Sequence, residues 1–151
     1  GVNIFRKPIV REFYGKKFFL AHGDGLGPGD HGYKFIKKVF ANPLCQWLFA
    51  RIHPNTGIGI ANFWSRRSRM SNGEMESFKG EENEYLVSFV KDTLKKEHYD
   101  YFIFGHRHLP LQMQIGKAWY INLGEWVNYT TYAVFDGTKL ELKHYREPVK
   151  K

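Results

Sequence analysis

The sequence predicts an α/β fold in which strands and helices form separate layers, an α+β layering. Strand-like patterns stand at both ends of the chain, with a helical stretch between them. The 151 residues suit one compact domain, and the apolar share of 42% and charged share of 25% are near those of globular proteins. Together these observations favour a layered globular domain.

The first element expected is a β-hairpin. The segments 9–14 and 17–22 flank Gly15 and are rich in aromatic and branched apolar residues, which is typical of two strands joined by a tight turn. A loop follows from Gly23 to Gly32, where repeated glycines and Pro28 predict neither helix nor strand.

The middle of the chain has the spacing of helices. Asn42 followed by Pro43 predicts an N-cap with proline at the first helical position. The polar segment 71–82 is expected to be a loop. Helices are expected where apolar residues recur at helical spacing or a cap precedes them, over 33–41, 43–51, 56–69 and 84–97.

The last third of the chain returns to strands. A short apolar run between Asp100 and Gly105 predicts a buried strand. Gly116-Lys117 and Asp136-Gly137 predict the turns of two hairpins. The expected strands are 101–104, 111–115, 118–123, 130–135 and 139–145.

Composition narrows the classes of function. A single cysteine, Cys45, excludes an internal disulfide framework and a four-thiolate zinc site. The net charge of +8 and the aromatic share of 17% indicate an anionic or amphiphilic partner. Nucleic acid, a phosphorylated metabolite and a membrane surface all fit this charge.

Two histidines directly follow a predicted strand. His106 and His108 stand in the segment Gly105-His-Arg-His108, and residues two apart in an extended chain point to the same side. Imidazole is a common ligand of Zn²⁺, Mn²⁺ and iron. The pair therefore indicates either a metal site or two surface histidines.

His22 stands in the same context, at the end of segment 17–22 and the start of the glycine-rich loop. Two strand ends that each deliver a histidine into a glycine-containing loop favour the metal site, since sites lie at strand ends in α/β sheets. The other histidines lack this context and are expected to be ordinary surface or partly buried residues: His31, His53, His98 and His144.

These residues resemble known motifs. Ala21-His-Gly-Asp24 and Gly105-His-Arg-His108 are similar to the last two motifs of calcineurin-like metallophosphoesterases. Three further segments look like those of one family within that superfamily, the diphosphatases of lipid A biosynthesis that act on UDP-2,3-diacylglucosamine: residues 22–30, residues 62–69 and Leu123-Gly-Glu-Trp126.

The resemblance implies a metal centre. His22 and His106 would ligate one ion of a binuclear Mn²⁺ centre, and His108 would ligate the other. The reaction it implies is hydrolysis of the pyrophosphate bond of UDP-2,3-diacylglucosamine to UMP and 2,3-diacylglucosamine 1-phosphate.

The resemblance also implies substrate contacts by Asp30, Ser68 and Asn72. Arg66 and Arg69 are further candidates, because a guanidinium group matches phosphate well, although they also suit a solvated face. The family has a lysine where this sequence has Met75, and Lys79 is a nearby candidate for its place.

Residues 1–151 are expected to be the C-terminal portion of a single metallophosphoesterase domain, a β-sandwich flanked by helices with a helical lid insertion at about 33–69. The earlier superfamily motifs DxH, GDxxD and GNH[DE], which supply the remaining ligands, do not occur in the sequence. We therefore expect the 151-residue chain alone to be inactive, to hold at most one ion weakly, and either to self-associate through an exposed sheet edge or to remain bound to the missing half.

The expected partners are the diacylated lipid and the inner-membrane surface, with a cytoplasmic location peripheral to that membrane. Apolar side chains beside Lys34, Lys37, Lys38 and Arg51 are typical of an interfacial helix or a lid over acyl chains. Such a face also serves as a domain core, and we expect at least half of its members to pack there: Tyr33, Phe35, Ile36, Phe40, Leu44, Trp47, Leu48 and Phe49.

Two other functions fit part of the pattern. One is a calcineurin-like phosphoesterase that acts on another nucleotide or phosphate ester. The expected lid and the pattern of Asp30, Ser68 and Asn72 count against this alternative. The other is a non-enzymatic, basic nucleic-acid-binding domain. That reading has no recognisable binding motif behind it, so no nucleic-acid partner is expected.

Overall fold

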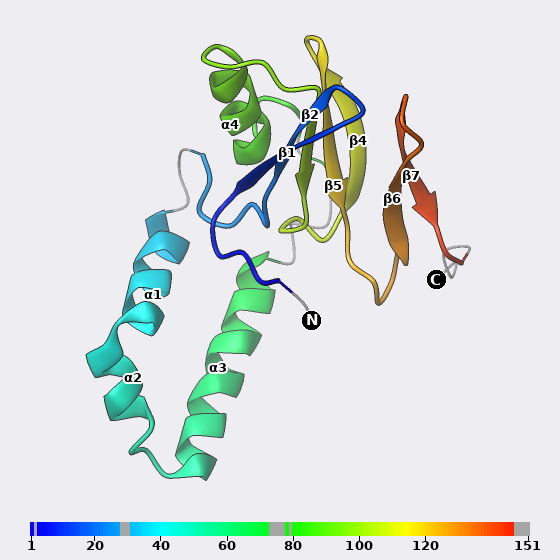
Figure 1. Ribbon diagram of the computed structural model, residues 1–151. Helices are drawn as coiled ribbons and strands as arrows, with labels where there is room; N and C mark the ends of the chain where they lie inside the picture. Colours follow the sequence, from blue (N-terminus) through cyan, green and yellow to red (C-terminus); the bar gives the residue numbers. More distant parts are fainter. Residues whose placement is uncertain (2, 28–30, 73–77, 79, 147–151) are drawn as a thin grey trace. The chain divides into compact units, whose positions relative to one another are not determined.

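The computed structural model describes residues 1, 3–27, 31–72, 78 and 80–146, with the backbone alone at 31–33 and 67–72. The chain divides into two compact units: a helical unit, Gly29–Glu76, and a sheet unit, Gly1–Pro28 with Ser77–Lys151. The elements shown in Figure 1 are β1 (Ile9–Phe13), β2 (Lys16–Leu20), α1 (His31–Ala41), α2 (Pro43–Phe49), α3 (Pro54–Asn72), α4 (Tyr85–Leu94), β3 (Tyr101–Phe104), β4 (Pro110–Ile115), β5 (Ala118–Leu123), β6 (Thr131–Phe135) and β7 (Leu140–His144).

A five-stranded sheet in the order β1-β2-β3-β5-β4 forms the centre of the sheet unit. β2, β3 and β5 run parallel, while β1 and β4 pair antiparallel at the two edges. β6 and β7 form a separate antiparallel pair. Figure 1 shows α4 on one side of the large sheet and β6 with β7 on the other, which confirms the predicted α/β layering.

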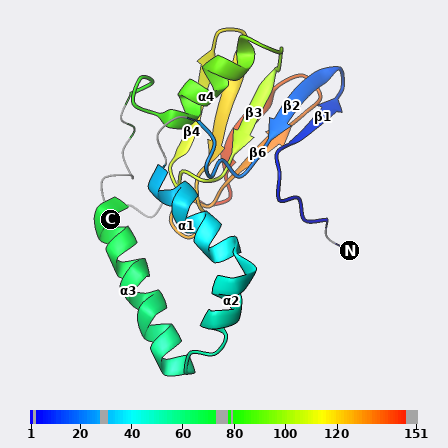
Figure 2. The ribbon, with the colours of Figure 1, turned by 90° about the vertical axis from the view of Figure 1, so that its left-hand side faces the viewer.

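Alternate residues of the central strands fill two cores. Phe19 and Phe102 pack against the buried face of α4, which lies across the sheet in Figure 2. Their neighbours Phe18 and Tyr101 face the other way and pack with Leu140 of β7. β2 and β3 are buried on both faces. This explains why their sequences contain continuous apolar runs, the pattern that predicts these strands.

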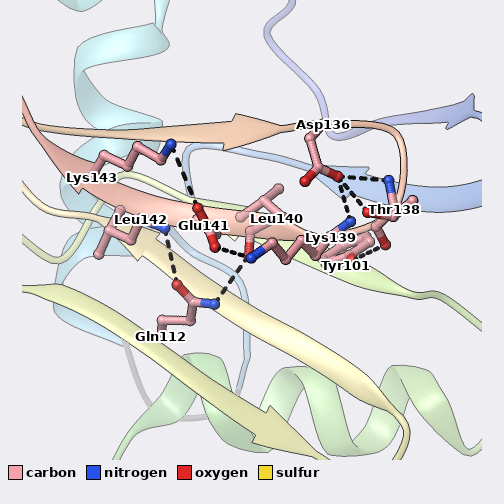
Figure 3. Close-up of polar contacts among 9 residues, drawn as sticks. All are labelled: Tyr101, Gln112, Asp136, Thr138, Lys139, Leu140, Glu141, Leu142 and Lys143. Carbon is pink, nitrogen blue, oxygen red and sulfur yellow. Dashed lines mark hydrogen bonds and ion pairs between the residues drawn. The ribbon is translucent and has the colours of Figure 1, made fainter.

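The hairpin turns follow from their sequences. Tyr14 and Gly15 have φ values of 51° and 71°, the left-handed conformation that a two-residue hairpin turn requires. In the β6–β7 turn, Asp136 Oδ1 accepts hydrogen bonds from the backbone N–H groups of Thr138 and Lys139, at 2.8 and 2.9 Å (Figure 3). All three predicted hairpins are confirmed, with strand ends that differ from the predicted ones by at most two residues.

Gln112 of β4 links the large sheet to β7. Its Nε2 donates to the carbonyl of Leu140 at 3.2 Å, and its Oε1 accepts from the N–H of Leu142 at 3.0 Å (Figure 3). One side chain thus satisfies two backbone groups of β7 and fixes the position of the small sheet on the large one.

The helical unit has helices at the expected places, with different boundaries. α1 begins at His31, so the last two residues of the predicted loop are helical; the N–H groups of a first turn need no intrahelical partner, which makes Gly32 acceptable there. Asn42 caps α2 as predicted, since its Oδ1 accepts from the N–H of Leu44 at 2.8 Å and of Cys45 at 3.3 Å. α2 ends at Phe49 rather than at 51.

α3 starts earlier and ends later than the predicted range 56–69. His53 Nδ1 accepts a hydrogen bond from the N–H of Asn55 at 3.3 Å, and Pro54 takes the first helical position, so the helix begins there. α3 ends at Asn72, so residues 71 and 72, the first two of the predicted loop 71–82, are helical. α4 stops at Leu94, short of the predicted 97, because the next N–H groups turn back onto the carbonyl of Thr93.

The apolar face of the helical unit is mostly exposed. Most of the residues expected to form a core have exposed side chains: Phe35, Phe40, Leu44, Trp47, Leu48 and Phe49. α2 spans 7 residues and contains no buried residue. The expectation that at least half of this face packs in a core is wrong. None of the helices in the described part of the chain is long and apolar enough to cross a membrane.

Candidate functional site

Three loops meet at one edge of the large sheet. β2, β3 and β5 are adjacent and parallel, so their carboxyl ends face the same edge, where α/β sheets place their ligand sites. His22 follows β2, the segment 105–109 follows β3, and Gly124 follows β5.

Backbone pairing continues beyond the strand ends and sets the register of the first two loops. The N–H of Ala21 donates to the carbonyl of Ile103 at 3.1 Å, and the N–H of Gly105 donates to the carbonyl of His22 at 3.0 Å. His22 therefore lies beside Gly105, one residue before His106.

The structure brings His22 and His106 together. His106 Nδ1 and His22 Nε2 are 3.2 Å apart, and the two rings meet edge to face with an interplanar angle of 80°. Gly23 has a φ of 108°, and a Cβ at this position would lie 3.2 Å from the Cβ of His106 and from a methyl group of Leu86. A glycine is thus required where the first loop passes the second histidine.

His108 is exposed, while Arg107 before it is buried with a relative exposure of 4%. His106 and His108 therefore flank a buried side chain; His106 contacts His22, and the shared direction of the two histidines stays a prediction. Glu125 in the third loop interacts electrostatically with His108. Burial alone would raise the pKa of Glu125, but hydrogen bonds from Asn128 and Val127 and the charge of His108 lower it below its usual value.

The histidine pair fits two positions in the coordination shell of one metal ion. Two nitrogen ligands at about 2.1 Å from one ion lie about 3.0–3.4 Å from each other at octahedral or tetrahedral angles, and the observed separation is 3.2 Å. Among the described residues, no group of three or more His, Cys, Asp and Glu side chains is placed to hold a metal ion. His108 thus does not complete a three-histidine group with His22 and His106.

The predicted substrate contacts are less fully described. Arg66 is an exposed residue of α3. Ser68, Arg69 and Asn72 belong to α3, but their side chains lie outside the described part of the structure, and so does the whole of Asp30. These residues remain predictions.

Sequence reasoning missed the buried polar residues beneath the histidine loop. Arg107 pairs with Glu84 at 2.8 Å, and Asn122 is fully buried in β5. The alternation of His106, Arg107 and His108 is the one signal that indicated an inward-facing arginine. Nothing in the sequence indicated that Glu84 would be its partner.

Comparison with known proteins relates the chain to one group of enzymes, although no family model matches it. A UDP-2,3-diacylglucosamine hydrolase of Porphyromonas gingivalis is 35% identical over 158 aligned positions, which cover 95% of this chain and 60% of that protein. Proteins of the same name from Serratia proteamaculans and Yersinia pseudotuberculosis are each 28% identical, with 83% of this chain and 53% of theirs covered. The chain thus spans about half to three fifths of the length of these relatives. The chain is similar to UDP-2,3-diacylglucosamine hydrolases along nearly all of its own length.

Proposed function

We propose that the intact protein to which this chain belongs hydrolyses the pyrophosphate bond of UDP-2,3-diacylglucosamine, with release of UMP and 2,3-diacylglucosamine 1-phosphate, whereas the 151-residue chain alone is inactive. The similarity along 95% of the chain to a hydrolase named for this substrate carries the proposal. The reaction consumes one water, and it breaks the bond between the bridging oxygen and the phosphorus of the uridylyl group.

His22 and His106 are the residues proposed to hold a divalent cation, with Mn²⁺ as the expected ion. Their nitrogens are already at ligand spacing. A cation bound there would supply positive charge next to the phosphate oxygens and activate water. His108, which lies on the same loop and is exposed, is proposed to contribute to a second ion.

The helical unit is proposed to receive the lipid end of the substrate and to meet the inner-membrane surface from the cytoplasmic side. Between His31 and Asn72 the sequence has no Asp or Glu, and its charged residues are Lys34, Lys37, Lys38, Arg51, Arg66, Arg67 and Arg69. Exposed apolar side chains such as Trp47 and Phe63, at 51% and 63%, accompany these charges. An acid-free surface that combines cations with apolar groups suits phosphate-bearing lipids. Asp30, Ser68, Asn72, Arg66 and Arg69 are proposed to contact the substrate.

The test is UMP release from UDP-2,3-diacylglucosamine in the presence of Mn²⁺, measured on the intact protein. We expect His22→Ala and His106→Ala each to lower kcat at least a hundredfold, because each removes one of two adjacent metal ligands. His98→Ala is the matched control, since His98 is exposed and lies before β3, at the opposite end of that strand from His106. Unchanged turnover in both site variants would refute the proposal.

A further inference from the structure

A buried polar cluster lies beneath the loop that carries His106 and His108. Glu84, Arg107 and Asn122 have relative exposures of 3%, 4% and 0%. They come from three places: the residue before α4, the loop after β3, and the strand β5. All three meet at residue 107.

The contacts hold this loop by both its side chain and its backbone. Arg107 Nη2 donates to Glu84 Oε1 at 2.8 Å. Asn122 Nδ2 donates to the carbonyl of Leu109 at 2.7 Å and also to the carbonyl of Arg107. The segment from Arg107 to Leu109 is thus held by hydrogen bonds at the guanidinium group of Arg107 and at the carbonyls of Arg107 and Leu109.

The position of Glu84 shows that its carboxylate serves the arginine. Glu84 occupies the N-cap position of α4, but its side chain makes no capping hydrogen bond to that helix. It pairs with Arg107 instead. An ion pair with both partners buried is weak evidence for stability, because desolvation of the charges offsets their attraction. Its use is more readily explained by the geometry that it imposes.

That geometry concerns the histidines. Arg107 is anchored in the core, while its neighbour His106 contacts His22 and its neighbour His108 is exposed. We propose that Glu84, Arg107 and Asn122 are positioning residues that preset His106 and His108 for a divalent cation. The proposal rests on the proposed function for the identity of the ion, and on the buried contacts for the mechanism.

The test compares Mn²⁺ binding and stability in the purified protein. Glu84→Gln removes the charge and keeps the shape, and we expect it to weaken Mn²⁺ binding about tenfold or more, as is typical when a partner of the ligand shell is lost. Glu81→Gln is the matched control. Glu81 lies three residues before Glu84, and its ion pair with Lys91 is exposed, so this variant should leave the affinity for Mn²⁺ unchanged. Calorimetric titration gives the affinity, and the ring signals of His106 and His108 in NMR report their orientation.

A second variant separates positioning from folding. The double variant Glu84→Met with Arg107→Met replaces the buried ion pair by apolar side chains of similar length, which is often neutral or stabilising. We expect it to fold with an unchanged or higher urea midpoint, but to bind Mn²⁺ more weakly and to show altered histidine ring signals. If Glu84→Gln or the double variant is folded and keeps both the affinity and the ring signals of the unaltered protein, the proposal is wrong.

The outcomes also distinguish this proposal from the proposed function. If the intact protein binds Mn²⁺, loses the ion in the variants and releases no UMP, the positioning role is retained and the diphosphatase activity is refuted. If the unaltered protein binds no Mn²⁺, the positioning role for a cation is refuted as well.

Discussion

Tyr120 of β5 is fully buried, and its hydroxyl has no hydrogen-bond partner among the described residues. Burial and the charge of Glu84 raise the pKa of this hydroxyl, against the effect of Arg107. A buried hydroxyl without a partner costs about 1–3 kcal/mol of stability. The ring of Tyr120 stabilises the core by packing, whereas its buried hydroxyl lowers the stability of the protein.

We therefore expect Tyr120→Phe to leave the free energy of unfolding unchanged or to raise it by about 1 kcal/mol. Urea denaturation measures this change. Tyr132→Phe is the control, because Tyr132 is 39% exposed and loses no buried group. A loss of stability in Tyr120→Phe beyond that of the control would show that the hydroxyl has a partner.

Asp136 gives the β6–β7 turn a pH dependence. Hydrogen bonds from the backbone of Lys139 and from Thr138 lower the pKa of Asp136 to about 2, from its ordinary 3.8. Because the folded value is the lower one, its stabilising effect is complete above pH 4 and is lost as the pH falls toward 2. We expect Asp136→Asn to lower the urea midpoint at pH 6, and the difference from the unaltered protein to shrink toward pH 2. A difference of the same size at both values would contradict this prediction.

At the scale of elements, the junction between β4 and β7 depends on one side chain. Gln112→Met keeps the volume of the side chain but removes its two hydrogen bonds to the backbone of β7. We expect a loss of about 1 kcal/mol, since the site is partly exposed and water replaces part of each bond. Hydrogen exchange of the β7 amides should rise in parallel. Gln114→Met, on the same strand with only a local bond to Gly116, should change neither quantity.

The edge strand β1 bears on association. Four of its five residues are exposed, and β1 lies at the edge of the sheet, hydrogen-bonded to β2 alone. Because an exposed edge strand can pair with another copy, we expect the 151-residue chain to self-associate at micromolar concentration in light scattering after size exclusion. Val10→Lys places a charge on this strand and should shift the chain toward monomer. Lys143→Arg, which keeps the charge on β7, should not.

At the scale of the whole molecule, the charge of +8 is unevenly spread along the chain. The acid-free segment of the helical unit combines cations with exposed apolar side chains, whereas the sheet unit carries most of the acidic residues. A lipid surface and a nucleic acid would respond differently to salt, because counterion release dominates nucleic-acid binding.

We expect the protein to bind vesicles of phosphatidylglycerol more strongly than vesicles of phosphatidylcholine, and to retain part of this binding in 0.5 M salt, a concentration at which surface charges are largely screened. Trp47→Gln should weaken vesicle binding about tenfold, since it removes one exposed aromatic group from the apolar contact. Trp119→Gln on β5 is the control, with 36% exposure in the sheet unit. Equal loss in both variants would argue against the helical unit as the contact.

Activity also depends on the whole molecule, because the two adjacent histidines come from distant parts of the chain. The described residues offer two adjacent histidines and no larger ligand group. We therefore expect the 151-residue chain by itself to release no UMP with Mn²⁺, on material of verified mass. Turnover by this chain as a monomer would show that ligands outside those identified complete the site.

Several local features of this protein can be predicted from short stretches of its sequence. Positive-φ turns at Tyr14-Gly15, the Asn42 cap and the alternation at residues 106–108 each depend on neighbours within a few positions, and such short-range preferences are written in the residues themselves. Helix ends were less well predicted, since His53 and the turn onto Thr93 act through hydrogen bonds that no periodicity reveals.

Contacts between residues that are distant in the sequence depend on how the strands and helices pack. His22 and His106 are 84 residues apart in the chain, and they are brought into contact by the register of two parallel strands. Glu84 and Arg107 become an ion pair because the start of α4 lies beside the loop after β3, where the ring centroids of Tyr85 and His106 are 6.4 Å apart, and both partners are buried. The strand register and the burial of side chains arise only when the chain packs. The sequence therefore indicates the histidines, and the packed structure shows which residues hold them in place.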